Sequence, residues 1–190
     1  CHRTGMSGGA LVRQDWQRCA APLYPVGAPQ ASLGVIFSIY RMMNEEDTNM
    51  EKYRVGIVGA TGMVGQRFVS LLQGHPWFRI TCLAASSRSA GKTYREAVGN
   101  RWAFEWEIPT EVADMGVLDA ADVDKVGELV DFVFCAVDMK KDEIRALEEA
   151  YAKHEIPVVS NNSACRGVED VPMVVPEINA DHIRVIEQQR

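Results

Sequence analysis

The strongest constraint on the fold is a glycine-rich segment that lies between an apolar run and an amphipathic one. The β-branched run Val55 to Val58 predicts a buried strand that ends at Gly59. Gly62 and Gly65 follow at regular spacing, and apolar residues at helical intervals come after them. A strand, a tight glycine turn and a helix N-terminus, in this order, offer free backbone N–H groups and a positive helix end. The segment predicts a dinucleotide pyrophosphate site, and the alternative is a glycine turn that binds nothing.

The composition is that of an ordinary globular protein. The chain has 190 residues, of which 47% are hydrophobic and 24% are charged, so a full core is possible. A net charge of −6 argues against nucleic acid and against an anionic membrane as partners. The 5 cysteines include no C-x-x-C pair, which argues against a zinc site and is typical of a reducing compartment. We therefore expect a cytoplasmic protein.

The chain divides into two parts of different character. Residues 1–49 show no sustained helical or strand period, and we expect an irregular or disordered extension outside the native domain. Their longest apolar stretch, Leu33 to Tyr40, is far shorter than the roughly 18 residues of a membrane span. Met50 directly precedes the first strand, so we prefer it as the natural start and expect one domain over residues 50–190.

From residue 50 onward, strand patterns alternate with helix patterns. The expected strands cover residues 53–59, 78–85, 131–137 and 156–160, and a less regular strand pattern covers residues 111–118. The expected helices cover about residues 62–73 and 140–153, and a last helix begins near Asp181 after an extended stretch over 171–178. This order predicts an α/β fold with a Rossmann-like, doubly wound and mostly parallel sheet that has helices on both faces.

The end of the second expected strand indicates which dinucleotide the site would accept. NAD-binding folds usually place an acidic residue there to accept a hydrogen bond from the ribose 2′-hydroxyl. This chain instead has Ser86, Ser87 and Arg88, with Lys92 nearby and no acid. Two hydroxyls and a guanidinium suit a 2′-phosphate, which favours NADP over NAD. The alternative is a solvated basic turn.

Three segments together resemble the aspartate-semialdehyde dehydrogenase family, in its archaeal and fungal branch. They are GATGMVGQRF at 59–68, SSRSAGK at 86–92 and the run from Ser160 to Asn179, and the resemblance covers about residues 52–190. The family implies an NADP-binding domain followed by a catalytic and dimerisation domain, which is missing here, and a homo-oligomer. Its reaction is the reversible reduction of an acyl phosphate, aspartyl-4-phosphate, to the semialdehyde in lysine, threonine and methionine biosynthesis. A cysteine forms a thioacyl-enzyme, NADPH gives the hydride, and a histidine acts as acid and base.

The resemblance assigns cofactor-binding residues by position. The glycine loop would wrap the pyrophosphate, the serine–arginine turn would hold the 2′-phosphate, and two strand ends would line the cleft. The assigned residues are Gly59, Thr61, Gly62, Met63, Val64, Gly65, Ser86, Ser87, Arg88, Ala136 and Asn161.

No catalytic residue is expected within this chain. The family's nucleophile lies in a Pro-Asn-Cys-Ser segment after the helix near Asp181, so we expect it beyond Arg190 and expect this part to bind NADP without catalysis. Cys165 sits in a different sequence context, which argues against it as the nucleophile. His75, His154 and His182 are expected in surface or capping positions. The acidic residues at 169, 170 and 177 lack His or Cys at ligand spacing, so we expect no metal.

Other functions stay open. N-acetyl-glutamyl-phosphate reductase and malonyl-CoA reductase share the scaffold, although the first usually has an Asp-x-Ser-x-Asp-x-Arg pattern where this chain has Ser-Asn-Asn-Ser-Ala-Cys-Arg. A non-catalytic NADP-binding module is an alternative of a different class.

Overall fold

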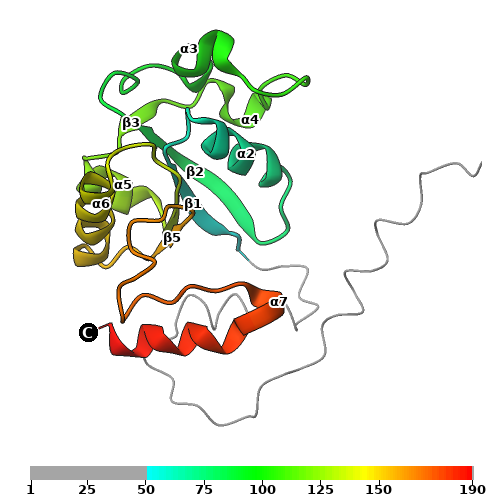
Figure 1. Ribbon diagram of the computed structural model, residues 1–190. Helices are drawn as coiled ribbons and strands as arrows, with labels where there is room; N and C mark the ends of the chain where they lie inside the picture. Colours follow the sequence, from blue (N-terminus) through cyan, green and yellow to red (C-terminus); the bar gives the residue numbers. More distant parts are fainter. Residues whose placement is uncertain (1–50, 190) are drawn as a thin grey trace, which may run out of the picture. The chain divides into compact units, whose positions relative to one another are not determined.

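The computed structural model describes residues 51–189, so the expectations for residues 1–49 lie outside the described residues (Figure 1). Its strands are Tyr53–Val58 (β1), Phe78–Ala85 (β2), Val117–Asp119 (β3), Phe132–Cys135 (β4) and Val158–Ser160 (β5). They form a 5-stranded, parallel sheet in the order β3-β2-β1-β4-β5. The strand order reverses at β1, which is the arrangement of a doubly wound Rossmann-type sheet. The expected fold class is therefore confirmed.

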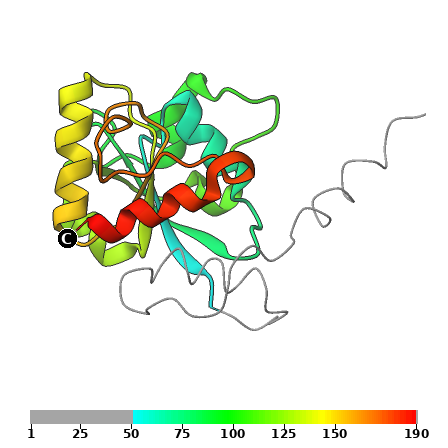
Figure 2. The same ribbon diagram turned by 60° about the horizontal axis from the view of Figure 1, so that its bottom comes forward.

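Helices cover both faces of this sheet. The helical elements are Met63–Leu71 (α2), Tyr94–Val98 (α3), Gly99–Arg101 (η1), Thr110–Ala113 (α4), Val123–Leu129 (α5), Lys141–Lys153 (α6), Pro176–Asn179 (α7) and Ala180–Gln188 (η2). Buried residues of α2, α3 and α4 share one core cluster, and those of α5 and α6 share the other. Figures 1 and 2 accordingly show α2 and α6 on opposite sides of the sheet.

The central strands are buried on both faces, because helices lie above and below them. Along β1, Val55 and Ile57 enter the cluster beside α2, whereas Val58 enters the cluster beside α5 and α6. Side chains alternate in the same way along β4, where Phe132 and Cys135 lie on opposite faces. This double burial explains why the sequence of both strands reads as a nearly continuous apolar run.

Two buried tyrosines fix the helices to loops at the carboxyl ends of strands. The Tyr94 hydroxyl on α3 donates to the carbonyl of Ala60 in the glycine loop at 2.9 Å. The Tyr151 hydroxyl on α6 donates to the carbonyl of Ala120, just after β3, at 2.9 Å. In each tyrosine the aromatic ring is buried and the hydroxyl is hydrogen-bonded to a backbone carbonyl. The loops that follow β1 and β3 are held in place as a result.

Two expectations about local structure need correction. The strand expected over residues 111–118 is wrong in its first half, because α4 begins just after Pro109 and buries Val112 against the core. The strand there begins only at Val117. The extended stretch expected over 171–178 ends at Val175, because Pro176 occupies the first turn of α7, a position that proline favours.

Within residues 51–189, no helix is both long enough and apolar enough to cross a membrane.

Candidate dinucleotide site

A crevice is expected where the chain leaves adjacent strands toward opposite faces of the sheet, and β1 and β4 meet this condition. Gly59 follows β1 and Ala136 follows β4, and the Ala136 N–H donates to the carbonyl of Val58 at 2.8 Å. Gly59 has a φ of +90°, and a Cβ at this residue would lie 2.4 Å from the Ala136 carbonyl oxygen. The glycine loop after β1 and the loop after β4 are therefore so close together that only glycine fits at residue 59.

The N-terminus of α2 faces this point without any side-chain cap. Gly62 is its extended N-cap residue and supplies no side-chain hydrogen-bond acceptor, and no acidic residue lies in the first turn. Helix α3, in contrast, is capped by its own side chains, because Thr93 and Glu96 form a capping box at its N-terminus. The first N–H groups of a helix need acceptors from outside it, and the helix dipole makes this end positive. The α2 terminus is thus suited to an anion.

The fold constrains the three glycines of the loop to different degrees. Gly65 lies in α2, where a Cβ would lie 2.2 Å from the carbonyl oxygen of Gly59, so helix and loop are in direct backbone contact. Gly59 is required by its positive φ and by the contact with Ala136. Gly62 is exposed, and a Cβ there would meet only the Gly59 oxygen at an ordinary 3.5 Å. The fold does not demand a glycine at residue 62, whereas a ligand on the helix terminus would.

The turn after β2 presents the second part of the expected site. Ser86, Ser87 and Arg88 are exposed, and the Ser89 N–H closes the turn by donating to the Ser86 carbonyl at 2.8 Å. Among the described residues, the Arg88 guanidinium has no hydrogen-bond or ion-pair partner. Because β2 pairs with β1, this turn lies at the same edge of the sheet as the glycine loop. An anion at this edge would find a guanidinium whose donors are available.

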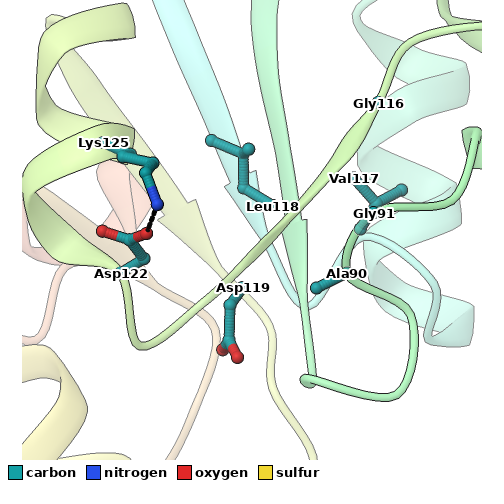
Figure 3. A pocket seen from close by; sticks show the side chains of 8 residues that line it. All are labelled: Ala90, Gly91, Gly116, Val117, Leu118, Asp119, Asp122 and Lys125. Carbon is teal, nitrogen blue, oxygen red and sulfur yellow. Dashed lines mark hydrogen bonds and ion pairs between the residues drawn. The ribbon is translucent and has the colours of Figure 1, made fainter.

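An acidic residue, Asp119, lies one strand further out, at the end of β3. Asp119 is paired in register with Ala85, and its carboxylate accepts from the Ala121 N–H at 3.0 Å. It also lines a hollow of about 320 Å³ whose other charged residues, Asp122 and Lys125, form an ion pair (Figure 3). Two carboxylates and a paired lysine suit an anion poorly, so a phosphate is better placed on the Arg88 side.

The ends of β4 and β5 lie on the other side of β1 from the turn after β2. The Asn161 N–H donates to the carbonyl of Cys135 at 2.9 Å, which places Asn161 beside the end of β4. Its side chain is exposed and makes no hydrogen bond to the described residues. The structure therefore brings Ala136 and Asn161 together with the glycine loop at one sheet edge, as the parallel strand ends predict.

A buried carboxylate supports this end of β5. Glu148 on α6 is 7% exposed, and it accepts hydrogen bonds from the Ser160 hydroxyl and from the Asn162 amide, the latter at 3.1 Å. The Asn162 N–H in turn donates to the Ser160 hydroxyl at 3.0 Å. The two residues that flank Asn161 are thereby fixed. Sequence periodicity points Ile144, Leu147 and Tyr151 inward, and it gives no sign that a glutamate on the same helix is buried.

Cys165 lies in the loop after β5, close to Glu148. Burial is the largest cause that raises the pKa of its thiol to about 11, and the Glu148 carboxylate raises it further. The three histidines of the described range have partners elsewhere: Trp77 and Phe78 for His75, Asp124 for His154, and Met173 for His182. A thiol whose pKa is raised in this way, with no histidine beside it, stays protonated at neutral pH, which makes it a poor nucleophile.

We expect Cys165 to be alkylated slowly by iodoacetamide at pH 7, because only a minute fraction of a thiol with a pKa near 11 is thiolate. The alkylation rate at this residue should rise about tenfold for each pH unit between pH 8 and pH 10, because the thiolate fraction rises by the same factor. Quantifying the labelled peptide by mass spectrometry measures this dependence. A rate that has already levelled off at pH 7 would contradict it and would reopen the question of Cys165 as the nucleophile.

In residues 51–189 no group of three or more His, Cys, Asp or Glu side chains is arranged to hold a metal ion.

Comparison with known proteins gives a consistent result. The family model described as "Semialdehyde dehydrogenase, NAD binding domain" matches residues 54–186. Aspartate-semialdehyde dehydrogenase of Archaeoglobus fulgidus is 43% identical over 141 residues, which are 73% of this chain and 38% of that protein. The enzyme of Methanothermobacter thermautotrophicus is 47% identical over 136 residues, 72% of this chain and 37% of that protein. The crystal structure of the Candida albicans enzyme with NADP has a TM-score of 0.66 at 38% identity, and the match covers 73% of this chain and 37% of that one.

The sheet order, with its reversal at β1, and the glycine loop between β1 and α2 are those of a dinucleotide-binding domain of the Rossmann type. Within that class, the chain belongs to the semialdehyde dehydrogenase family, in the part that the family model describes as the NAD-binding domain. It spans 37–38% of the length of the two archaeal relatives. The resemblance found in the sequence is confirmed.

Proposed function

We propose that this chain is the NADP-binding part of an aspartate-semialdehyde dehydrogenase, which reduces aspartyl-4-phosphate to aspartate 4-semialdehyde and releases phosphate. The observation that carries the proposal is the uncapped N-terminus of α2, which lies at the same sheet edge as the exposed turn of Ser86, Ser87 and Arg88. The names of the archaeal relatives support the reaction, and the NADP of the Candida albicans structure supports the cofactor.

The glycine loop fits a pyrophosphate. A Cβ at Gly62 would contact only the Gly59 oxygen, at 3.5 Å, and residue 62 is exposed, so a ligand can approach the backbone there more closely than it could approach any other residue type. Thr61, Met63 and Val64 flank this opening, and the backbone N–H groups at the start of α2 would donate to the phosphate oxygens. The exposed, uncapped start of the helix matches the donor set that such a ligand needs.

The turn after β2 fits a 2′-phosphate. The Arg88 guanidinium can bind two phosphate oxygens at once, and the Ser86 and Ser87 hydroxyls can donate to the same group. At a site that favours NAD, a carboxylate takes the place of these donors and accepts from the ribose hydroxyl. The turn carries no carboxylate from Ser86 to Lys92, so the chemistry of the donor set favours NADP.

Bound NADPH would supply the hydride, and this chain's own residues would bind and orient it. Ala136 and Asn161 lie beside the ends of β1 and β4, so we assign them to the part of the cofactor that extends beyond the pyrophosphate toward β4 and β5. The raised pKa of Cys165 argues against it as the nucleophile, which we infer comes from a part of the protein outside these residues. We further propose that residues 50–190 form the binding domain of a cytoplasmic homo-oligomer.

Arg88→Ala tests the cofactor assignment. We expect the variant to bind NADPH about 10- to 150-fold more weakly, because it loses a charge-assisted contact worth about 1.5–3 kcal/mol. NADH lacks the 2′-phosphate, so its affinity should change less than about twofold. Fluorescence titration of the 190-residue chain measures both constants.

Arg95→Ala is the matched control for the lost positive charge, because Arg95 is exposed on α3 and its guanidinium has no partner among the described residues. Equal affinity of the unaltered chain for NADPH and NADH would contradict the assignment of NADP. An absence of binding of either would contradict the dinucleotide site itself.

A further inference from the structure

One buried amide connects the glycine loop to a distant part of the chain. Gln66 on α2 is 2% exposed, and its Nε2 donates to the carbonyls of Thr61 at 3.0 Å and of Arg101 at 3.1 Å. Its Oε1 accepts from the Ala103 N–H at 2.8 Å. Both donors and the acceptor of the amide are therefore engaged. Replacing a buried amide whose donors and acceptor are all hydrogen-bonded lowers the free energy of unfolding, because its partners would be left without hydrogen bonds.

The Gln66 amide holds the peptide that leads into the N-terminus of α2. The carbonyl of this peptide, that of Thr61, accepts from Gln66, and its N–H, that of Gly62, donates to the Gly59 carbonyl at 3.1 Å. Both polar groups of one peptide plane are thus fixed from different directions. The plane sets how the chain enters the helix, and therefore where the N–H groups of the next residues point.

The other end of the link is an aromatic loop, residues 101–106, that is braced by its own contacts. The rings of Phe104 and Trp106 stack at 4.8 Å, and the Trp102 indole N–H donates to the Trp106 carbonyl at 2.6 Å. The Arg67 guanidinium lies 5.7 Å from the Phe104 ring centroid, so α2 contacts the loop a second time. Such contacts restrict the loop, which allows it to serve as a fixed support for the Gln66 amide.

We propose that Gln66 is a positioning residue that orients the glycine loop for pyrophosphate by tying the Thr61–Gly62 peptide to the aromatic loop. This inference rests on the proposed NADP-binding function. A loop already held in its bound geometry avoids the cost of ordering when the ligand binds. The loss of Gln66 should therefore weaken the contacts to the pyrophosphate and leave those to the 2′-phosphate unchanged, because the turn after β2 makes no hydrogen bond to Gln66.

Gln66→Leu in the 190-residue chain separates these two effects when three ligands are titrated. ADP-ribose carries the pyrophosphate without a 2′-phosphate, 2′-AMP carries the 2′-phosphate without a pyrophosphate, and NADPH carries both. We expect the dissociation constants of NADPH and ADP-ribose to rise about tenfold each, and that of 2′-AMP to change less than about twofold. A general loss of structure would weaken all three alike.

Gln73→Leu is the matched control. Gln73 follows the same helix, and its amide donates only to the Val69 carbonyl, one helical turn earlier, at 3.0 Å. We expect it to leave all three dissociation constants unchanged. A folded Gln66→Leu variant with unchanged affinity for ADP-ribose overturns the inference and leaves the proposed function intact. If the unaltered chain binds neither NADPH nor ADP-ribose, the proposed function and the inference both fail.

If Gln66→Leu does not fold, hydrogen exchange in the unaltered chain decides. Saturation with ADP-ribose should slow the exchange of the Gln66 side-chain amide protons about tenfold or more, because the ligand stabilises the loop that they hold. The amide protons of Gln73 should exchange at an unchanged rate, and 2′-AMP should slow neither set. Equal exchange of the Gln66 protons with and without ADP-ribose overturns the inference.

Discussion

Gly65→Ala is expected to lower the free energy of unfolding by about 2 kcal/mol or more, although alanine is the better helix former. By helix propensity alone, the substitution within α2 would stabilise the chain by about 1 kcal/mol. The new Cβ, however, would lie 2.2 Å from the Gly59 carbonyl oxygen and 2.7 Å from the Ala60 Cα. Backbone atoms cannot turn aside as a side chain can, so α2 must move away from the loop and from the core that Val69 fills. Urea denaturation followed by circular dichroism measures the loss.

Gly127→Ala is the matched control, because Gly127 also lies inside a helix, α5. A Cβ there would meet the Cδ1 atom of Ile156 at 2.9 Å, which is the far end of a flexible side chain. The gain in helix propensity and the cost of moving Ile156 should nearly cancel, so we expect a change within about 1 kcal/mol. If Gly65→Ala were as mild as Gly127→Ala, the close contact between α2 and the glycine loop would be contradicted.

The sequence predicts well those elements whose residues carry their own signal. The bounds of β2 agree at both ends, and β1 and α6 agree to within one residue, because strand alternation, continuous burial and a long amphipathic period are local properties. Helix α5 is not predicted, because its 7 residues bury only Val123 and Val126, too few to establish a period. Its helical state depends on packing against β1 and β2, which a local pattern does not contain.

In the candidate site, too, some residues carry a local sequence signal and others depend on contacts distant in sequence. The glycines and the serine–arginine turn are visible in the sequence because the chemistry of phosphate binding restricts residue type at fixed spacing. Gln66 and Glu148 are not visible in this way, because a polar residue on a helix normally faces solvent. Each is buried only because loops distant in sequence bring donors or acceptors to it. The groups that hold the site in place are thus the ones that sequence reasoning missed.

Gly62→Ala should have the opposite pattern of effects from Gly65→Ala, and it separates a glycine that the ligand needs from one that the fold needs. Gly62 has a φ of −78°, which alanine adopts freely, and a Cβ there would meet no protein atom closer than 3.5 Å. Losing glycine at an N-cap is mild, so the free energy of unfolding should fall by less than about 1 kcal/mol.

The affinity of the same variant for NADPH should fall about 100-fold. The methyl group would stand where the pyrophosphate must approach the N–H groups of Met63 and Val64, and a charge-assisted hydrogen bond lost there costs about 1.5–3 kcal/mol. A 100-fold change corresponds to about 2.7 kcal/mol, which the loss of one or two such bonds supplies. Titration of NADPH into the variant, with its denaturation midpoint measured in parallel, tests both halves. Unchanged NADPH affinity would show that the ligand does not contact this turn, whereas a large loss of stability would show that the fold, and not the ligand, requires glycine at residue 62.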